Sequence, residues 1–153
     1  MRDEIFKKKK EESLTAVSFL AALNDNLDKD TSFKIALDAF TRYLTNLYKK
    51  VLEKTTEGSQ ERFDKFREFY EEFAEKTPYC EILESTSTIL KVKFIRCPFF
   101  EVLKDSNLEY LAHAYCLSDP AFTKNVLPGV NFSRKHLISN NEPYCDNTWE
   151  FTG

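Results

Sequence analysis

Apolar side chains return every three or four residues over most of the first half of the chain. Three segments follow this spacing: residues 11–27, residues 31–51 with Thr31 or Ser32 as the cap, and residues 59–77. Such periodicity predicts amphipathic α-helices, each with one buried face. The apolar face of the third segment is aromatic, and we expect it in the core; it consists of Phe63, Phe66, Phe69, Tyr70 and Phe73.

The pattern changes after residue 78. Residues 85–95 are rich in β-branched side chains and alternate apolar residues with lysines, which predicts a strand with one buried face. Short helices are predicted at residues 99–104 and 108–116. The Ser-Asp-Pro-Ala sequence at 118–121 predicts the start of a further helix, with a capping side chain and a proline in its first turn.

Two closing strands are predicted at residues 130–139 and 144–152, joined by the polar residues 140–143. Two strand-like segments around a short polar turn are typical of a β-hairpin. We therefore expect an α+β fold, in which N-terminal helices precede an antiparallel sheet of at least three strands with short helices packed on one face.

Length and composition are those of one globular domain. A chain of 153 residues with 42% hydrophobic and 14% aromatic residues can bury a substantial core. We expect a single domain over residues 1–153, with a helical half at 1–77 and a strand-helix-hairpin half at 78–153 that carries any site.

The charge argues against several classes of partner. A net charge of -3 and a pI near 5.5 give no general attraction for phosphate backbones, so no nucleic-acid partner is expected. No apolar stretch is long enough for a membrane span, and no secretory signal is recognisable, so we expect a cytoplasmic protein with its four cysteines reduced. The sequence leaves open whether the protein forms a homodimer.

Three of the cysteines lie where one predicted element gives way to the next: Cys97, Cys116 and Cys145. No glycine-rich phosphate loop, His-Glu-x-x-His or Cys-x-x-Cys sequence is present. A thiol at a helix N-terminus is expected to have a lowered pKa, which makes Cys97 the best nucleophile on local grounds. The alternative is that all three are small buried hydrophobic residues, as free cysteines commonly are.

Four short sequences in the last third of the chain resemble the L-2-amino-thiazoline-4-carboxylic acid hydrolase family. They are Cys-Pro-Phe at 97–99, Tyr-Cys-Leu-Ser-Asp-Pro-Ala-Phe at 115–122, Phe-Ser-Arg at 132–134 and Tyr-Cys-Asp-Asn-Thr-Trp at 144–149. The chain departs from the family at 140–143, where a glycine is usual, and at Asn147, where an aromatic residue is usual. The layout is also similar to the small-molecule-binding domains of the 4-vinyl reductase type.

The resemblance implies hydrolysis of a 2-amino-thiazoline ring to a carbamoyl derivative of cysteine, and it leaves two mechanisms open. In one, Cys97 or Cys116 attacks as a thiolate and Asp119 assists proton transfer. In the other, Cys97, Cys116 and Cys145 bind a zinc ion that activates water. Whether a metal is bound is unknown from the sequence.

Two further residues complete the candidate site. Arg134 alternates with apolar residues on its predicted strand, where it could bind a substrate carboxylate through two hydrogen bonds. Asp146 points away from Cys145 if the strand is regular, so Cys145 is the preferred site residue of the two. Asp119 has a structural interpretation as well, as the cap of the helix that begins beside Pro120.

Two other functions fit the same sequence. The chain could be a non-catalytic small-molecule or metal-binding sensory domain with an aromatic pocket. It could also be a scaffold that associates through its long second helix.

Overall fold

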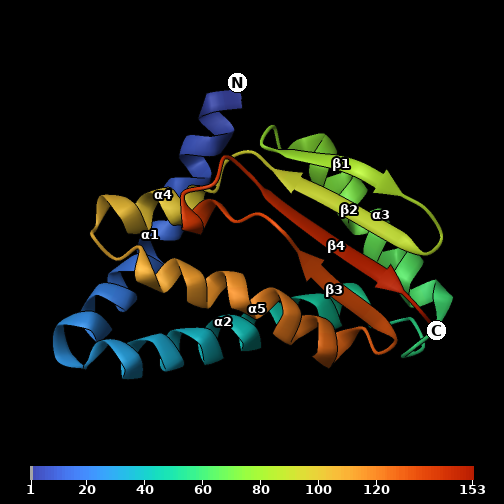
Figure 1. Ribbon diagram of the computed structural model, residues 1–153, viewed down its shortest axis with the longest axis horizontal. Helices are drawn as coiled ribbons and strands as arrows, with labels where there is room; N and C mark the ends of the chain where they lie inside the picture. Colours follow the sequence, from blue (N-terminus) through green and yellow to red (C-terminus); the bar gives the residue numbers. More distant parts are fainter. Residues whose placement is uncertain (1) are drawn as a thin grey trace.

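The computed structural model describes residues 2–153, and over this range the chain has the predicted α+β fold (Figure 1). Helices and strands follow one another in the order α1 Arg2–Asn26, α2 Lys29–Val51, α3 Gln60–Lys76, β1 Cys80–Ser85, β2 Ile89–Phe94, α4 Pro98–Asp105, α5 Tyr110–Val126, β3 Val130–Arg134, the 3₁₀ helix η1 Ile138–Asn140, and β4 Cys145–Phe151.

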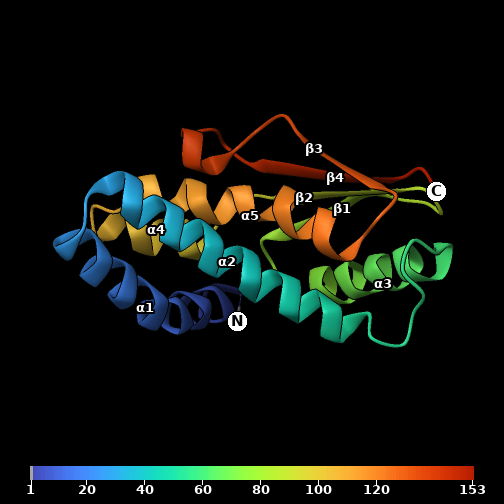
Figure 2. The ribbon, with the colours of Figure 1, turned by 90° about the horizontal axis from the view of Figure 1, so that it is seen from below.

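The four strands form one antiparallel sheet in the order β1-β2-β4-β3. Figure 2 shows the sheet edge-on, with the α-helices on one side of it, which confirms the predicted arrangement. The inner strands bury Leu90, Val92 and Trp149 completely. No helix within residues 2–153 has the length and apolar character needed to cross a membrane.

Two clusters of buried side chains make up the core. The first packs α3 and the C-terminal halves of α2 and α5 against the sheet, and it contains the predicted aromatic face of α3. The second packs α1 and α4 against the N-terminal halves of α2 and α5. Because α2 and α5 run through both clusters, these two helices connect the sheet to the helical end of the molecule.

The N-terminal helices differ from the prediction in their bounds. Helix α1 begins well before residue 11, because Phe6 adds a buried position whose ring packs on Tyr79 with centroids 5.2 Å apart. Helix α2 is capped by Asp28, so the expected cap at Thr31 or Ser32 was wrong. The Asp28 carboxylate accepts hydrogen bonds from the amide of Thr31 at 2.9 Å and from its hydroxyl at 2.6 Å.

The sequence interpretation did not include strand β1. Acidic residues are disfavoured in strands, and this segment carries Glu81 and Glu84. Both are paired across the sheet with lysines of β2, Glu84 with Lys91 at 2.5 Å and Glu81 with Lys93 at 3.9 Å. The two acidic side chains that made this strand hard to predict are therefore paired with basic side chains of β2.

Helix α5 is where the prediction was most in error. Residues 118–121 do not start a helix, because α5 continues through Pro120. The hydroxyl of Ser118 bonds to the carbonyl of Tyr115, and that of Thr123 to the carbonyl of Asp119 at 2.8 Å, so neither acts as a cap. Asp119 lies inside the helix and is not an N-cap.

The closing hairpin is confirmed, with shorter strands than expected. Strand β3 pairs with β4 from Val130 opposite Phe151 to Arg134 opposite Asn147. The connection over residues 135–144 contains η1, which ends at Asn141 in the left-handed conformation with φ of 63°. This connection covers the end of α5 where the candidate site lies.

Candidate functional site

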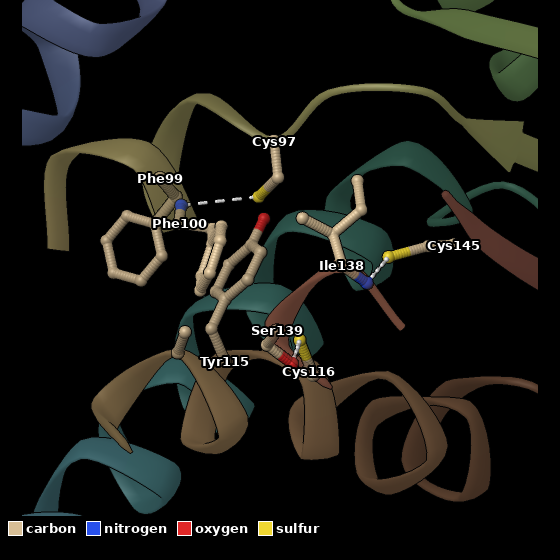
Figure 3. Close-up of a pocket in the computed structure, with 9 residues that line it drawn as sticks. Cys97, Phe99, Phe100, Tyr115, Cys116, Ile138, Ser139 and Cys145 are labelled. Atoms are coloured by element: carbon tan, nitrogen blue, oxygen red, sulfur yellow. Dashed lines mark hydrogen bonds between the residues drawn. The ribbon is translucent and has the colours of Figure 1, made fainter. Parts of the chain in front are cut away.

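Three cysteines from three different elements line one small cavity (Figure 3). Cys97 is the N-cap of α4, Cys116 lies in the middle of α5, and Cys145 is the first residue of β4. The remaining walls come from Phe99, Phe100, Ala112, Tyr115, Ile138 and Ser139. The fold thus brings together the three thiols that the sequence pointed to.

Each thiol has a defined hydrogen-bond partner. The Sγ of Cys97 accepts from the amide of Phe100 at 3.4 Å, which is the geometry of a helix cap. The Sγ of Cys145 accepts from the amide of Ile138 at 3.2 Å, and the Sγ of Cys116 lies 3.5 Å from the hydroxyl of Ser139. Helix η1 therefore contacts two of the three thiols.

Burial keeps all three thiols protonated in this state. It raises the pKa of Cys97 to about 12 and that of Cys116 to about 11, and it raises the pKa of Cys145 as well. The expected lowering of the Cys97 pKa is therefore not found, because loss of solvent outweighs the amide of Phe100. Cys116 differs from Cys97 in having the Ser139 hydroxyl and the Arg134 guanidinium close enough to favour its thiolate.

The cavity is small. Its free volume of about 10 Å³ is no more than one water molecule needs. A small organic molecule can reach the thiols only if part of the wall moves. The wall formed by η1 belongs to a connection between strands, whereas the other walls belong to α4, α5 and β4.

An ion pair lies directly behind Cys116. The guanidinium of Arg134, 9% exposed, binds the carboxylate of Asp119, and its Nε donates to Oδ1 of Asn147 at 2.7 Å. Its Nη1 and Nη2 also donate to the carbonyl of Cys116, at 3.2 and 3.3 Å. That carbonyl is available because Pro120 has no N–H to complete the helical hydrogen bond.

The pKa of the Asp119 carboxyl group lies close to neutral pH. Burial raises its pKa to about 6, while the ion pair with Arg134 and a contact from the amide of Asn147 at 3.5 Å stabilise the charged form. Neither Asp119 nor Arg134 lines the cavity. They are linked to it through Cys116, whose carbonyl accepts hydrogen bonds from Arg134, and Arg134 in turn binds Asp119.

Comparison with known families finds a match that covers nearly the whole chain. A family model described as L-2-amino-thiazoline-4-carboxylic acid hydrolase matches residues 8–149. The chain belongs to this family. A search of curated proteins found no match.

A solved structure shares the fold of this thiazoline-carboxylate hydrolase family member. It is the trafficking protein particle complex subunit 3 from Naegleria fowleri, covalently bound to palmitic acid. The two chains are 12% identical, the alignment covers 95% of this chain and 96% of that one, and the TM-score is 0.56. At this identity the likeness supports the fold alone.

In this family member, Arg134 has few N–H groups left for the predicted binding of a substrate carboxylate. Its Nε and Nη groups already donate to Asn147, Cys116 and Asp119, which leaves a single N–H on Nη1. A substrate carboxylate could be bound through two hydrogen bonds only if it displaced Asp119. Asn147, where the sequence departs from the family pattern, is one of the partners that hold Arg134.

Asp146 lies on the other side of β4 from Cys145, as strand alternation requires. Its carboxylate accepts from the amides of Lys135 and His136, at 2.9 and 2.7 Å, and contacts Nδ1 of His136 at 2.9 Å. These bonds lower the pKa of Asp146, against the effect of burial. Asp146 therefore anchors the start of the connection that carries η1.

Three further polar side chains lie at the site. Ser139 contacts Cys116, His113 lies 3.5 Å from the Ser139 hydroxyl, and the Tyr115 ring lines the cavity between Phe40 and Phe99. His113 precedes Cys116 by three residues, a helical spacing that the sequence shows. No sequence signal marks Ser139, because its position depends on how the hairpin connection folds.

The thiols do not form a metal site. Among the residues that the structure describes, no three His, Cys, Asp or Glu side chains are arranged to hold a metal ion.

Proposed function

We propose that this chain is a hydrolase that opens the ring of L-2-amino-thiazoline-4-carboxylate to give a carbamoyl derivative of cysteine. The observation that carries the proposal is the convergence of Cys97, Cys116 and Cys145 on one cavity in a member of this family. A thiol is a strong nucleophile toward an amidine-like carbon once it is deprotonated.

The reaction adds one water to the substrate. A cysteine Sγ attacks ring carbon C2, the bond from C2 to the ring sulfur breaks, and the ring sulfur leaves as a thiol after taking up a proton. Water then attacks C2, the enzyme sulfur leaves, and the oxygen stays as the carbonyl of a carbamoyl group. The product carries a free thiol that the substrate lacks.

Cys116 is the proposed nucleophile. Among the three thiols, Cys116 is the one whose Sγ contacts a side-chain hydroxyl, that of Ser139, and the nearby Arg134 guanidinium favours its thiolate. The amidine of the substrate, when protonated, would add a cation next to the thiol and lower its pKa further. Cys97 and Cys145 are proposed to complete the wall against which the ring lies.

Asp119 and Arg134 are proposed to support Cys116 from behind. The pair fixes the carbonyl of Cys116 and thereby the direction of its side chain. With a pKa of about 6, Asp119 can also exchange a proton during the hydrolytic step at neutral pH. Arg134 is proposed to attract the substrate carboxylate through its remaining N–H.

The test is incubation of the purified protein with L-2-amino-thiazoline-4-carboxylate, with the carbamoyl product measured by mass spectrometry and the new thiol by a colour reagent. Cys116→Ser is expected to abolish turnover, and Cys97→Ser and Cys145→Ser to reduce it. Cys80→Ala is the matched control, because Cys80 is buried in β1 outside the cavity. Full activity in all three serine variants would overturn the site.

A non-catalytic binding domain is the competing function. It predicts that the thiazoline raises the melting temperature of the protein while no product forms. A covalent acyl group, as in the palmitic acid complex of the structural neighbour, finds less support. The free volume of about 10 Å³ beside the thiols holds neither the thiazoline ring nor an acyl chain, and a long chain needs a much larger movement of the wall than the ring does.

A further inference from the structure

Among the residues that line the cavity, none is a carboxylate that could accept the proton of the Cys116 thiol. The Asp119 carboxylate binds Arg134 and Asn147, and it does not line the cavity. A buried thiol with no acceptor for its proton is a poor nucleophile. The polar contacts of Cys116 therefore decide where its proton can go.

The contacts lead from Cys116 to a histidine. The Cys116 Sγ is 3.5 Å from the Ser139 Oγ, and the same oxygen is 3.5 Å from Nδ1 of His113 (Figure 3 shows the first contact). Cys116 and His113 lie on one face of α5, three residues apart, and Ser139 comes from η1 to lie between them. Three side chains from two elements thus form a continuous path.

We propose that Cys116, Ser139 and His113 form a proton relay, in which the His113 imidazole takes the thiol proton through the hydroxyl of Ser139. The thiol proton moves to the Ser139 Oγ while the hydroxyl proton of Ser139 moves to Nδ1 of His113. The result is a thiolate, an unchanged serine and an imidazolium. The imidazolium gives the proton to the ring sulfur as that sulfur leaves, which makes His113 neutral again. In the hydrolytic half, the attacking water supplies the proton that the Cys116 sulfur takes up as it leaves C2.

The surroundings of the thiol are consistent with this direction. Imidazole changes its charge nearest to neutral pH of all side chains, which suits an acceptor that must later act as a donor. The groups that face Cys116 from the other elements are Arg134 on β3, Cys145 on β4 and Cys97 before α4, with Asp119 on its own helix. Arg134 is the cation among them, and it favours the thiolate that the relay produces.

The relay also depends on the position of η1. Because Ser139 is the middle residue of η1, the path exists only when η1 lies against α5. Opening of the cavity for a ligand would break the path, and closure would restore it. The thiol is therefore activated in the closed state and not in the open one.

The first measurement needs no substrate. The chain has two histidines, so nitrogen NMR of ¹⁵N-histidine-labelled protein gives two imidazoles, which His136→Gln assigns. At pH 8 we expect His113 to carry its proton on Nε2, with Nδ1 free to accept, and Ser139→Ala to remove this preference. A proton on Nδ1 at pH 8, or the same tautomer in Ser139→Ala, would overturn the relay.

The second measurement is turnover. Only this part rests on the proposed function. Ser139→Ala and His113→Gln should lower kcat by about 10²-fold or more with little change in KM, and Ser139→Thr, which keeps the hydroxyl, should recover part of it. His136→Gln, the matched control, removes the imidazole outside the path and keeps the backbone amide that donates to Asp146, so it should keep wild-type activity. Wild-type kcat in Ser139→Ala and His113→Gln would overturn the relay and leave the hydrolase standing. If the wild type does not open the ring, the proposed function fails, and the NMR result alone decides the relay.

Discussion

Replacement of Arg134 by methionine tests the ion pair behind Cys116. The variant keeps most of the volume of the side chain and removes its charge and its hydrogen bonds. Arg134 and Asp119 have side chains that are 9% and 19% exposed, so water can replace little of what is lost. Breaking a buried pair by removing one partner typically costs about 3–5 kcal/mol.

A second cost arises at Cys116. Its carbonyl accepts from Arg134, and Pro120 cannot donate to it, so the methionine variant leaves this oxygen without a donor. A buried polar group without a partner costs about 1–3 kcal/mol. The two costs overlap, because the site will relax around both groups. We expect a loss of about 3–5 kcal/mol in the free energy of unfolding at pH 7.5.

The loss should depend on pH with a definite sign. Burial already raises the pKa of Asp119 to about 6, so its contribution to stability is full below about pH 4 and is lost as the pH rises through 6. Without Arg134 the pKa of Asp119 rises further, so the variant continues to lose stability as the pH rises above 6. The difference between wild type and variant should therefore be largest above pH 7 and smallest near pH 4.

The assay is urea unfolding followed by the fluorescence of Trp149, the only tryptophan, which is fully buried. Asp119→Asn and the double variant complete a mutant cycle, in which the double variant should cost less than the sum of the single ones. Arg42→Met is the control, since its pair with Asp38 is exposed and should matter by less than about 1 kcal/mol. A loss below about 1 kcal/mol in Arg134→Met, or additive costs in the cycle, would show that the ion pair contributes little to stability.

Three further predictions follow from single contacts. Cys97→Ser should leave stability within about 1 kcal/mol of wild type in a urea titration, because serine is a good N-cap for α4; a larger loss would mean that the thiol matters mainly for packing. Thr123→Val should cost about 1–3 kcal/mol by the same assay, since it leaves Nε1–H of Trp149 buried without its partner at 3.0 Å; an unchanged midpoint would contradict this. Asp146→Ala should release the amides of Lys135 and His136, loosen η1 and speed alkylation of the cavity thiols, measured by peptide mass spectrometry, whereas unchanged rates would show that η1 is held in another way.

The sequence predicted those parts of the fold that depend on local pattern. Helical spacing located the helices of the first half, and alternation located β2 and the closing hairpin. Strand β1 was missed because its acidic side chains depend on lysines of β2, which local propensity cannot reveal. Helix α5 was divided at Pro120 because a proline after a serine and an aspartate usually marks a helix start.

In the candidate site, too, local sequence features predicted some residues and not others. The three cysteines could be chosen from the sequence because they lie at element boundaries, but their meeting in one cavity depends on how α4, α5 and β4 pack. The sequence predicted Arg134 as a substrate-binding residue and did not predict its partners in the fold, because these come from α5 and β4, more than ten residues away along the chain. Ser139 could not be found at all, since a serine in a polar connection has no distinguishing pattern.

Pro120 links these observations physically. A proline inside a helix removes the donor for the carbonyl four residues earlier, which here is Cys116, and such a residue normally costs about 3 kcal/mol. The orphaned carbonyl is bound by Arg134, whose charge in turn needs Asp119, and the pair is completed by Asn147. Pro120→Ala should therefore restore a helical hydrogen bond to Cys116 and compete with Arg134 for the same oxygen. Greater stability together with lower turnover in this variant would show that the proline serves the position of Cys116, whereas lower stability would show that the helix needs the proline for its own packing.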